Sequence, residues 1–77
     1  MELQLADTVH FEYPHTFINV VTYTQDVMGL ITEIFFEDNH SVVVARYCDI
    51  EAAVIGHHSF LQRDVARFIV ENHLGSL

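Results

Sequence analysis

The chain has 77 residues, which is enough for one domain and too short for a second. Its formal net charge of −8, from eleven acidic residues against three arginines, argues against direct binding to nucleic acid, because phosphate contacts need a cationic surface. One cysteine excludes an internal disulfide, and no apolar run approaches the roughly eighteen residues of a membrane span.

The N-terminal segment, residues 1–15, has two interpretations. Val9 and Phe11 alternate with polar residues, a pattern typical of a short edge strand that ends at Pro14. An arm lying on a neighbouring subunit would show the same alternation, and the sequence does not separate the two. The first residues are acidic where a signal peptide is basic, so we expect no secretion by a signal peptide.

Residues 16–48 are rich in β-branched and aromatic side chains, which predicts an antiparallel meander. Three strands are expected, at 16–24, 30–37 and 41–48, and residues 1–15 are the candidate for a fourth. The connection at 25–29 contains Gly29, whose backbone freedom suits a turn. Asp38 and Asn39 tolerate positive φ and predict a two-residue hairpin loop between the last two strands.

The two-residue loop fixes which residues of the hairpin share a face. One face pairs Leu30 with Tyr47, Thr32 with Ala45, Ile34 with Val43 and Phe36 with Ser41. This face carries no charge and is assigned to the helix. The other face has an apolar patch, where a sheet facing water is usually polar. We therefore predict that it meets another chain, through Ile31, Glu33, Phe35, Val42, Val44 and Arg46, with Glu33 and Arg46 close enough to pair diagonally. The alternative is that residues 1–15 fold over it.

Residues 49–75 predict one long amphipathic helix that packs on one face of the sheet. Its apolar stripe recurs in steps of three and four, at Ile50, Val54, Leu61, Val65 and Phe68, with His57 and Asn72 in the remaining steps. Asp49 is the expected N-cap, because its carboxylate can accept from the free amides of the first turn. Gly75 is expected to close the last turn in the left-handed conformation.

Together these elements predict one α+β domain over residues 1–77, an antiparallel meander of three or four strands with one long C-terminal helix across one face. Gly56 lies in the middle of that helix, where glycine costs about 1 kcal/mol relative to alanine. Such a glycine indicates close approach of a neighbouring group, and a ring of Tyr47 or Phe36 would fit. A local kink is the other interpretation.

No motif predicts catalysis, a metal or a cofactor. His57 and His58 are weak metal candidates, because adjacent helical residues point about 100° apart and neither has a second ligand four residues away. A histidine on the apolar stripe is more often a hydrogen-bonded core residue. Cys48 or Ser59 with a histidine base would be the nucleophile candidates, and no flanking motif supports either. We expect a protein that is not an enzyme.

The run from Arg46 to His57 resembles a pattern in small proteins encoded by tailed bacteriophages. In that pattern a short meander leads into a helix that opens with Tyr, a capping Ser or Thr, acidic residues, Ala and then Gly-His. Six residues carry the resemblance: Tyr47, Asp49 at the capping position, Glu51, Ala53, Gly56 and His57. Ala52 departs from it, since an acidic residue there would complete a capping box. The resemblance implies a phage origin and a non-enzymatic accessory role.

These observations lead to one expected function and two alternatives. We expect a non-enzymatic phage interaction or structural protein that forms homo-oligomers through its open sheet face, in the virion or in the host cytoplasm. The acidic charge suits the first alternative, an inhibitor of a basic host protein of defence or nucleic-acid binding. The second alternative is a small metal-binding protein or enzyme. No cofactor, membrane or direct nucleic-acid partner is expected.

Overall fold

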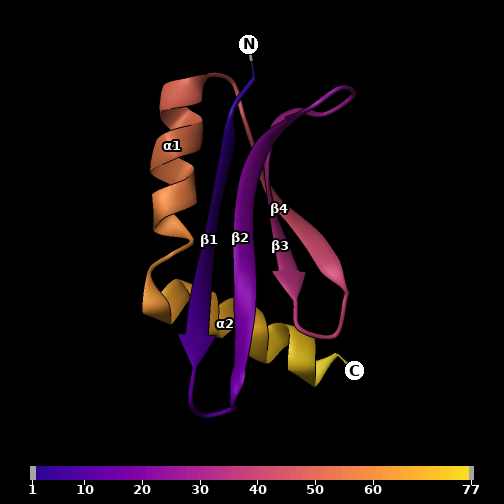
Figure 1. The fold of residues 1–77 in the computed structure, drawn as a ribbon, viewed down its shortest axis with the longest axis vertical. Coiled ribbons are helices and arrows are strands. Elements are labelled where there is room, and N and C mark those ends of the chain that lie inside the picture. The colour runs from indigo at the N-terminus through magenta and orange to yellow at the C-terminus, as the bar shows by residue number, and fades with distance from the viewer. Residues whose placement is uncertain (1, 77) are drawn as a thin grey trace.

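A computed structural model describes residues 2–76 and has the α+β class that the sequence predicts. Four antiparallel strands form one sheet in the order β1-β2-β3-β4, a meander in which each strand pairs with the next. Their bounds are β1 Gln4–Phe11, β2 Thr16–Gln25, β3 Gly29–Phe36 and β4 Ser41–Tyr47, followed by the helices α1 Ile50–Ser59 and α2 Arg63–Gly75. In Figure 1, α1 runs along the strands, whereas α2 crosses them near one end of the sheet. No helix of the described residues is long and apolar enough to span a membrane.

The N-terminal segment forms an edge strand and not an arm. Strand β1 pairs with β2 over its whole length, from Gln4 opposite Tyr23 to Phe11 opposite Thr16. Val9 and Phe11 are buried on the side of the sheet that faces the helices, which explains their alternation with exposed residues. The segment therefore extends the sheet at its edge, and it does not fold over the opposite face.

The predicted single helix over residues 49–75 is wrong, because this part of the chain forms two helices. Ala53 and His57 are the buried residues of α1, and Ala66 and Val70 are those of α2. At about 100° per residue, the step from His57 to Ala66 corresponds to about two and a half turns. A straight helix would therefore direct the two buried stripes to opposite sides. The break between α1 and α2 brings both stripes onto the same sheet.

Details of the second helix also differ from the expectation. Gln62 has an extended backbone, with φ −66° and ψ 134°, and interrupts the helical run just before α2. Phe68, expected on the buried stripe, is 67% exposed, and Asn72 is exposed as well. Gly75 is the last residue of α2, and Ser76 follows it with a right-handed φ of −94°. The expected left-handed closure at Gly75 is therefore wrong.

Asp49 caps the first helix as predicted. Its backbone is extended, and its Oδ1 accepts a hydrogen bond from the amide of Ala52 over 2.8 Å. Replacing Asp49 by alanine removes this acceptor, so we expect the free energy of unfolding to fall by about 1 kcal/mol. Urea denaturation followed by circular dichroism measures the loss. Asp49→Ser keeps an acceptor and should stay close to the parent protein; equal losses in the two variants would contradict the capping role.

The hairpin of β3 and β4 has the predicted register at one end only. The pairs Leu30–Tyr47, Ile31–Arg46 and Thr32–Ala45 are confirmed. Beyond them the pairs are Glu33–Val43, Ile34–Val42 and Phe35–Ser41, one residue out of the expected register. The loop has three residues and not two, because the Phe36 amide donates to the His40 carbonyl over 2.8 Å. Asn39 supplies the positive φ, 74°, that such a loop needs.

A β-bulge at Val44 reconciles the two registers and changes the side on which the valines lie. Val42 pairs with Ile34 and faces the helices, and Val44 packs against the core. The prediction that Val42 and Val44 lie on the open face is therefore wrong. Val43, which is 37% exposed, lies there instead, on the same face as Phe35.

The hydrophobic core lies between the sheet and the two helices. Helix α1 contacts β2, β3 and β4, and α2 contacts β1. Its main buried cluster consists of Val9, Phe11, Ile18, Val20, Ile34, Ala66 and Val70. At the β1 edge, the guanidinium carbons of Arg63 and Arg67 lie 5.6 and 5.3 Å from the centroid of the Phe11 ring. These cations cover the aromatic edge of the core on the side of α2.

Candidate functional site

The face of the sheet that points away from the helices is uncovered within residues 2–76. Its larger apolar side chains come from β2, β3 and β4 and are Phe17, Val21, Tyr23, Ile31, Phe35 and Val43. Phe35 and Val43 are each 37% exposed and present apolar surface to solvent. Ile31 lies on the same face but is buried, because its cross-strand neighbours Tyr23 and Arg46 flank it. We call this surface the open face.

Glu33 and Arg46 carry the charges that were predicted on this face. Glu33 accepts from the Tyr23 hydroxyl over 2.7 Å and from the Ser41 hydroxyl over 2.6 Å. The hydrogen bond to this carboxylate raises the pKa of Tyr23 above its ordinary value. Arg46 donates instead to the Met28 carbonyl over 3.5 Å, so the expected diagonal pair with Glu33 is not formed. Glu33 is held by groups of the sheet, and Arg46 is held by the turn between β2 and β3.

A chain of hydrogen bonds runs through the core between the sheet and α1. It joins, in order, Asp7, His57, Thr22, Thr32 and Tyr47. Asp7 Oδ2 lies 2.7 Å from His57 Nε2, and the Thr22 hydroxyl lies 2.7 Å from His57 Nδ1. The two threonine hydroxyls are 2.6 Å apart, and the Tyr47 hydroxyl is 2.7 Å from Thr32 Oγ1. His57 is thus the hydrogen-bonded core histidine that the sequence suggests, with both ring nitrogens satisfied.

The order carboxylate, imidazole and hydroxyl is that of a nucleophilic triad, but here it is structural. Thr22 is fully buried and its hydroxyl is also bonded to Thr32, so no substrate reaches it. The predicted nucleophile candidates lie elsewhere. Cys48 is an exposed free thiol, and the Ser59 hydroxyl donates to the Ile55 carbonyl over 3.0 Å.

The motif residues at the start of α1 have structural roles. The ring of Tyr47 lies directly against Gly56, where any Cβ would overlap it, so the predicted close approach is confirmed. Ala53 is fully buried. Asp49 caps the helix, and the exposed Glu51 adds negative charge in the first turn, where the helix dipole favours it. The motif therefore explains how α1 is seated on the sheet.

His57 and His58, the weak metal candidates, do not form a shared site. Both nitrogens of His57 are hydrogen-bonded, so this ring would have to release Thr22 or Asp7 to bind an ion. The ring of His58 is exposed and nearly perpendicular to that of His57, at 81° with centroids 5.9 Å apart. Adjacent helical positions separate the two rings as expected.

A second polar cluster, at the surface, joins the β3–β4 loop to the last turn of α2. His73 Nε2 donates to Asp38 Oδ2 over 2.8 Å, and His40 Nδ1 lies 3.1 Å from the same oxygen. The backbone amide of His40 donates to Asp38 Oδ1 over 3.0 Å. These bonds, above all the one from His73, hold the pKa of the Asp38 carboxyl well below its usual range. We call this group the Asp38–His40–His73 cluster.

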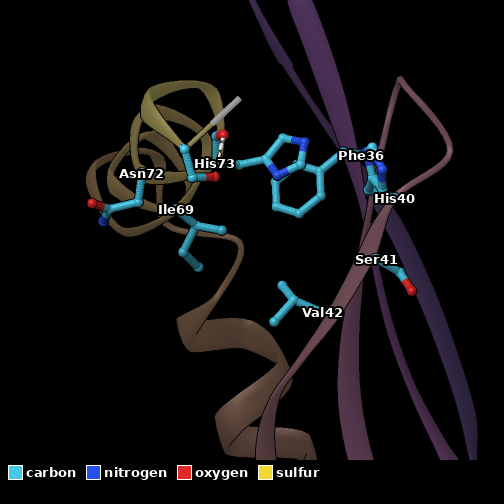
Figure 2. Close-up of a pocket in the computed structure, with 8 residues that line it drawn as sticks. Phe36, His40, Ser41, Val42, Ile69, Asn72 and His73 are labelled. Atoms are coloured by element: carbon cyan, nitrogen blue, oxygen red, sulfur yellow. Dashed lines mark hydrogen bonds between the residues drawn. The ribbon is translucent and has the colours of Figure 1, made fainter.

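Two cavities adjoin this cluster, and His73 lines both. The larger, of about 540 Å³, lies between α2 and β4; Figure 2 shows Val42 and Ile69 beside it. The ring of His73 stacks on Phe36 with centroids 3.7 Å apart and planes 9° apart, and the two rings overlap in the same view. The smaller, of about 330 Å³, lies beside the turn between β1 and β2.

Comparisons with protein-family models, curated proteins and solved structures found no match. The resemblance to tailed-phage proteins and the expected partners therefore stay predictions. Two surface features of the described residues are candidate functional sites: the open face of the sheet and the Asp38–His40–His73 cluster.

Proposed function

We propose that this protein is a non-enzymatic assembly protein that binds a second copy of itself through the open face of the sheet. The supporting observation is the exposed apolar surface of Phe35 and Val43, on a face that neither helix nor β1 covers within residues 2–76. A domain of this size has a thin core, and association can bury the apolar surface that folding leaves exposed.

The distribution of charge permits two acidic chains to meet at this face. The chain carries eleven acidic residues, but Glu33 is the one acidic residue at the strand positions of the open face in the described part of the chain. Arg46 lies on the same face and balances it. The other acidic residues lie outside this face, and physiological salt screens exposed charges beyond about 8 Å. A two-fold pair of open faces is therefore compatible with a net charge of −8.

The proposal includes the setting that the phage resemblance implies, an accessory protein of the virion or of the infected cytoplasm. The motif residues within 46–57 position α1 on the sheet. The open face is therefore available for a partner. The acidic inhibitor of a basic host protein stays a prediction. Such a partner would bind the acidic turns and loops and not the nearly neutral open face, so the two functions would use different surfaces.

Phe35→Asp tests the assembly proposal. We expect the parent protein to be a dimer in size-exclusion chromatography with light scattering, and Phe35→Asp to be a monomer at the same concentration. A buried carboxylate at an apolar contact should cost about 2 kcal/mol or more, which weakens the dimer roughly 30-fold. Phe35 is 37% exposed in the single chain, so the variant should still fold.

Phe68→Asp is the matched control. This phenylalanine lies on α2, away from the open face, and is 67% exposed. It tests whether exposed phenylalanine as such drives association, and we expect this variant to remain a dimer. A monomeric parent protein would contradict the proposal, and so would dissociation by Phe68→Asp with Phe35→Asp still dimeric.

A further inference from the structure

We propose that the Asp38–His40–His73 cluster binds one divalent transition-metal ion of the zinc class. Two imidazole nitrogens and one carboxylate oxygen form a donor set that such ions prefer. The three ligand atoms all lie within 4.8 Å of one another. The site is separate from the open face and does not depend on assembly.

The distances within the cluster are close to those of a coordination shell. Tetrahedral zinc with bonds of about 2.0–2.1 Å holds its ligand atoms about 3.3–3.4 Å apart. Asp38 Oδ2 lies 2.8 Å from His73 Nε2 and 3.1 Å from His40 Nδ1. The two imidazole nitrogens lie within 4.8 Å of each other. Small outward shifts from the carboxylate oxygen, together with an approach of the two nitrogens to each other, would let an ion replace the protons that now join these atoms.

The ligand side chains are oriented by contacts other than those among the three ligand atoms. The His40 amide donates to Asp38 Oδ1 over 3.0 Å, which orients the carboxylate and leaves Oδ2 for the ion. The stacking of His73 on Phe36 fixes the plane of that imidazole. Supporting contacts of this kind orient metal ligands and reduce the entropy lost on binding.

Three protein ligands leave the fourth tetrahedral position for water or for an exogenous ligand. His40 and His73 also line the cavity of about 540 Å³, so a small molecule has room beside the ion. Val42 and Ile69 give this cavity an apolar wall, as Figure 2 shows. The geometry suits a ligand with one metal-binding group and an apolar remainder.

Isothermal titration of the purified protein with zinc chloride alone tests the site. We expect one ion per chain. Asp38→Asn and His40→Gln should each weaken zinc binding on the order of 100-fold. Removal of a direct ligand should reduce the affinity as much as the largest reductions known for residues that only orient a ligand. The side chain of His40 is 66% exposed, so His40→Gln should not disturb the fold. His58→Gln removes another exposed histidine outside the cluster and should bind zinc as the parent protein does.

Thermal unfolding gives a second measurement. The ion would link the β3–β4 loop to α2, so zinc should raise the unfolding temperature of the parent protein and of His58→Gln, but not of Asp38→Asn. The unfolding temperature of Asp38→Asn without zinc checks that this variant is folded. The proposal is wrong if the parent protein does not bind zinc, or if His58→Gln and His40→Gln lose the same affinity for zinc. Repeating the titration on monomeric Phe35→Asp separates it from assembly.

Discussion

Replacing His57 by alanine should lower the free energy of unfolding by about 3–5 kcal/mol. The imidazole is fully buried, so its removal leaves a cavity between α1 and the sheet. The Thr22 hydroxyl and the Asp7 carboxylate also lose their partner, and the buried hydroxyl cannot turn to water instead. At 0.05–0.15 kcal/mol per residue, a chain of this length has a total of about 4–12 kcal/mol, so the loss is a large fraction of the total and the variant should unfold at a much lower urea concentration.

The neighbouring histidine is the control for this prediction. His58 is exposed on the same helix, and His58→Ala should change the free energy of unfolding by no more than about 0.5 kcal/mol. Urea denaturation monitored by circular dichroism compares the two variants under one condition. If His57→Ala unfolds at the same urea concentration as His58→Ala, the chain of hydrogen bonds from Asp7 to Tyr47 does not hold α1 on the sheet.

The features that the sequence predicts correctly are those encoded within a few residues. The strands follow runs of β-branched and aromatic residues, and Asp49 caps a helix because its acceptor lies three residues from Ala52. Gly56 signals a close neighbour because mid-helix glycine otherwise lowers stability, and Tyr47 is that neighbour. Each of these inferences needs only local chemistry.

The break between the helices escapes prediction because nothing at residues 60–62 marks it. That segment contains neither glycine nor proline, and an apolar stripe continues through it at helical spacing. The true stripe of α2 uses the small Ala66 and leaves Phe68 exposed, whereas hydrophobicity alone ranks Phe68 first. The phase change between His57 and Ala66 becomes visible only when the buried residues are known.

The hairpin register and the surface cluster both depend on structural details that local sequence does not encode. A three-residue loop shifts the strand pairing by one residue, and the bulge at Val44 shifts it back. The pairs far from the loop therefore agree with a two-residue loop, although the pairs next to the loop do not. The cluster joins the loop residues Asp38 and His40 to His73 on a helix that crosses the end of the sheet. Because α2 takes that path only where the helix breaks, the sequence does not predict the cluster. It does not predict the shifted register either.

Replacing Gly56 by alanine should lower the free energy of unfolding by about 2–3 kcal/mol, even though alanine favours the helix by about 1 kcal/mol. A Cβ at this position would overlap the ring of Tyr47. The ring has to tilt to make room, and its hydroxyl then leaves Thr32 Oγ1, which is 2.7 Å away in the parent protein. Overlap and the weakened hydrogen bond together outweigh the gain in helix propensity.

Two further variants separate the overlap from a general effect of alanine. Gly75 is the last residue of α2 and has no heavy atom within 4 Å of its Cβ position, so Gly75→Ala should be neutral or stabilising. In a Tyr47→Ala background the overlap is gone, and Gly56→Ala should then add up to about 1 kcal/mol of stability. A change of sign between the two backgrounds is the expected result of the double-mutant cycle. If Gly56→Ala destabilises the protein equally with and without the Tyr47 ring, that ring does not explain the glycine. The backbone of α1 at this turn would then be the reason for it.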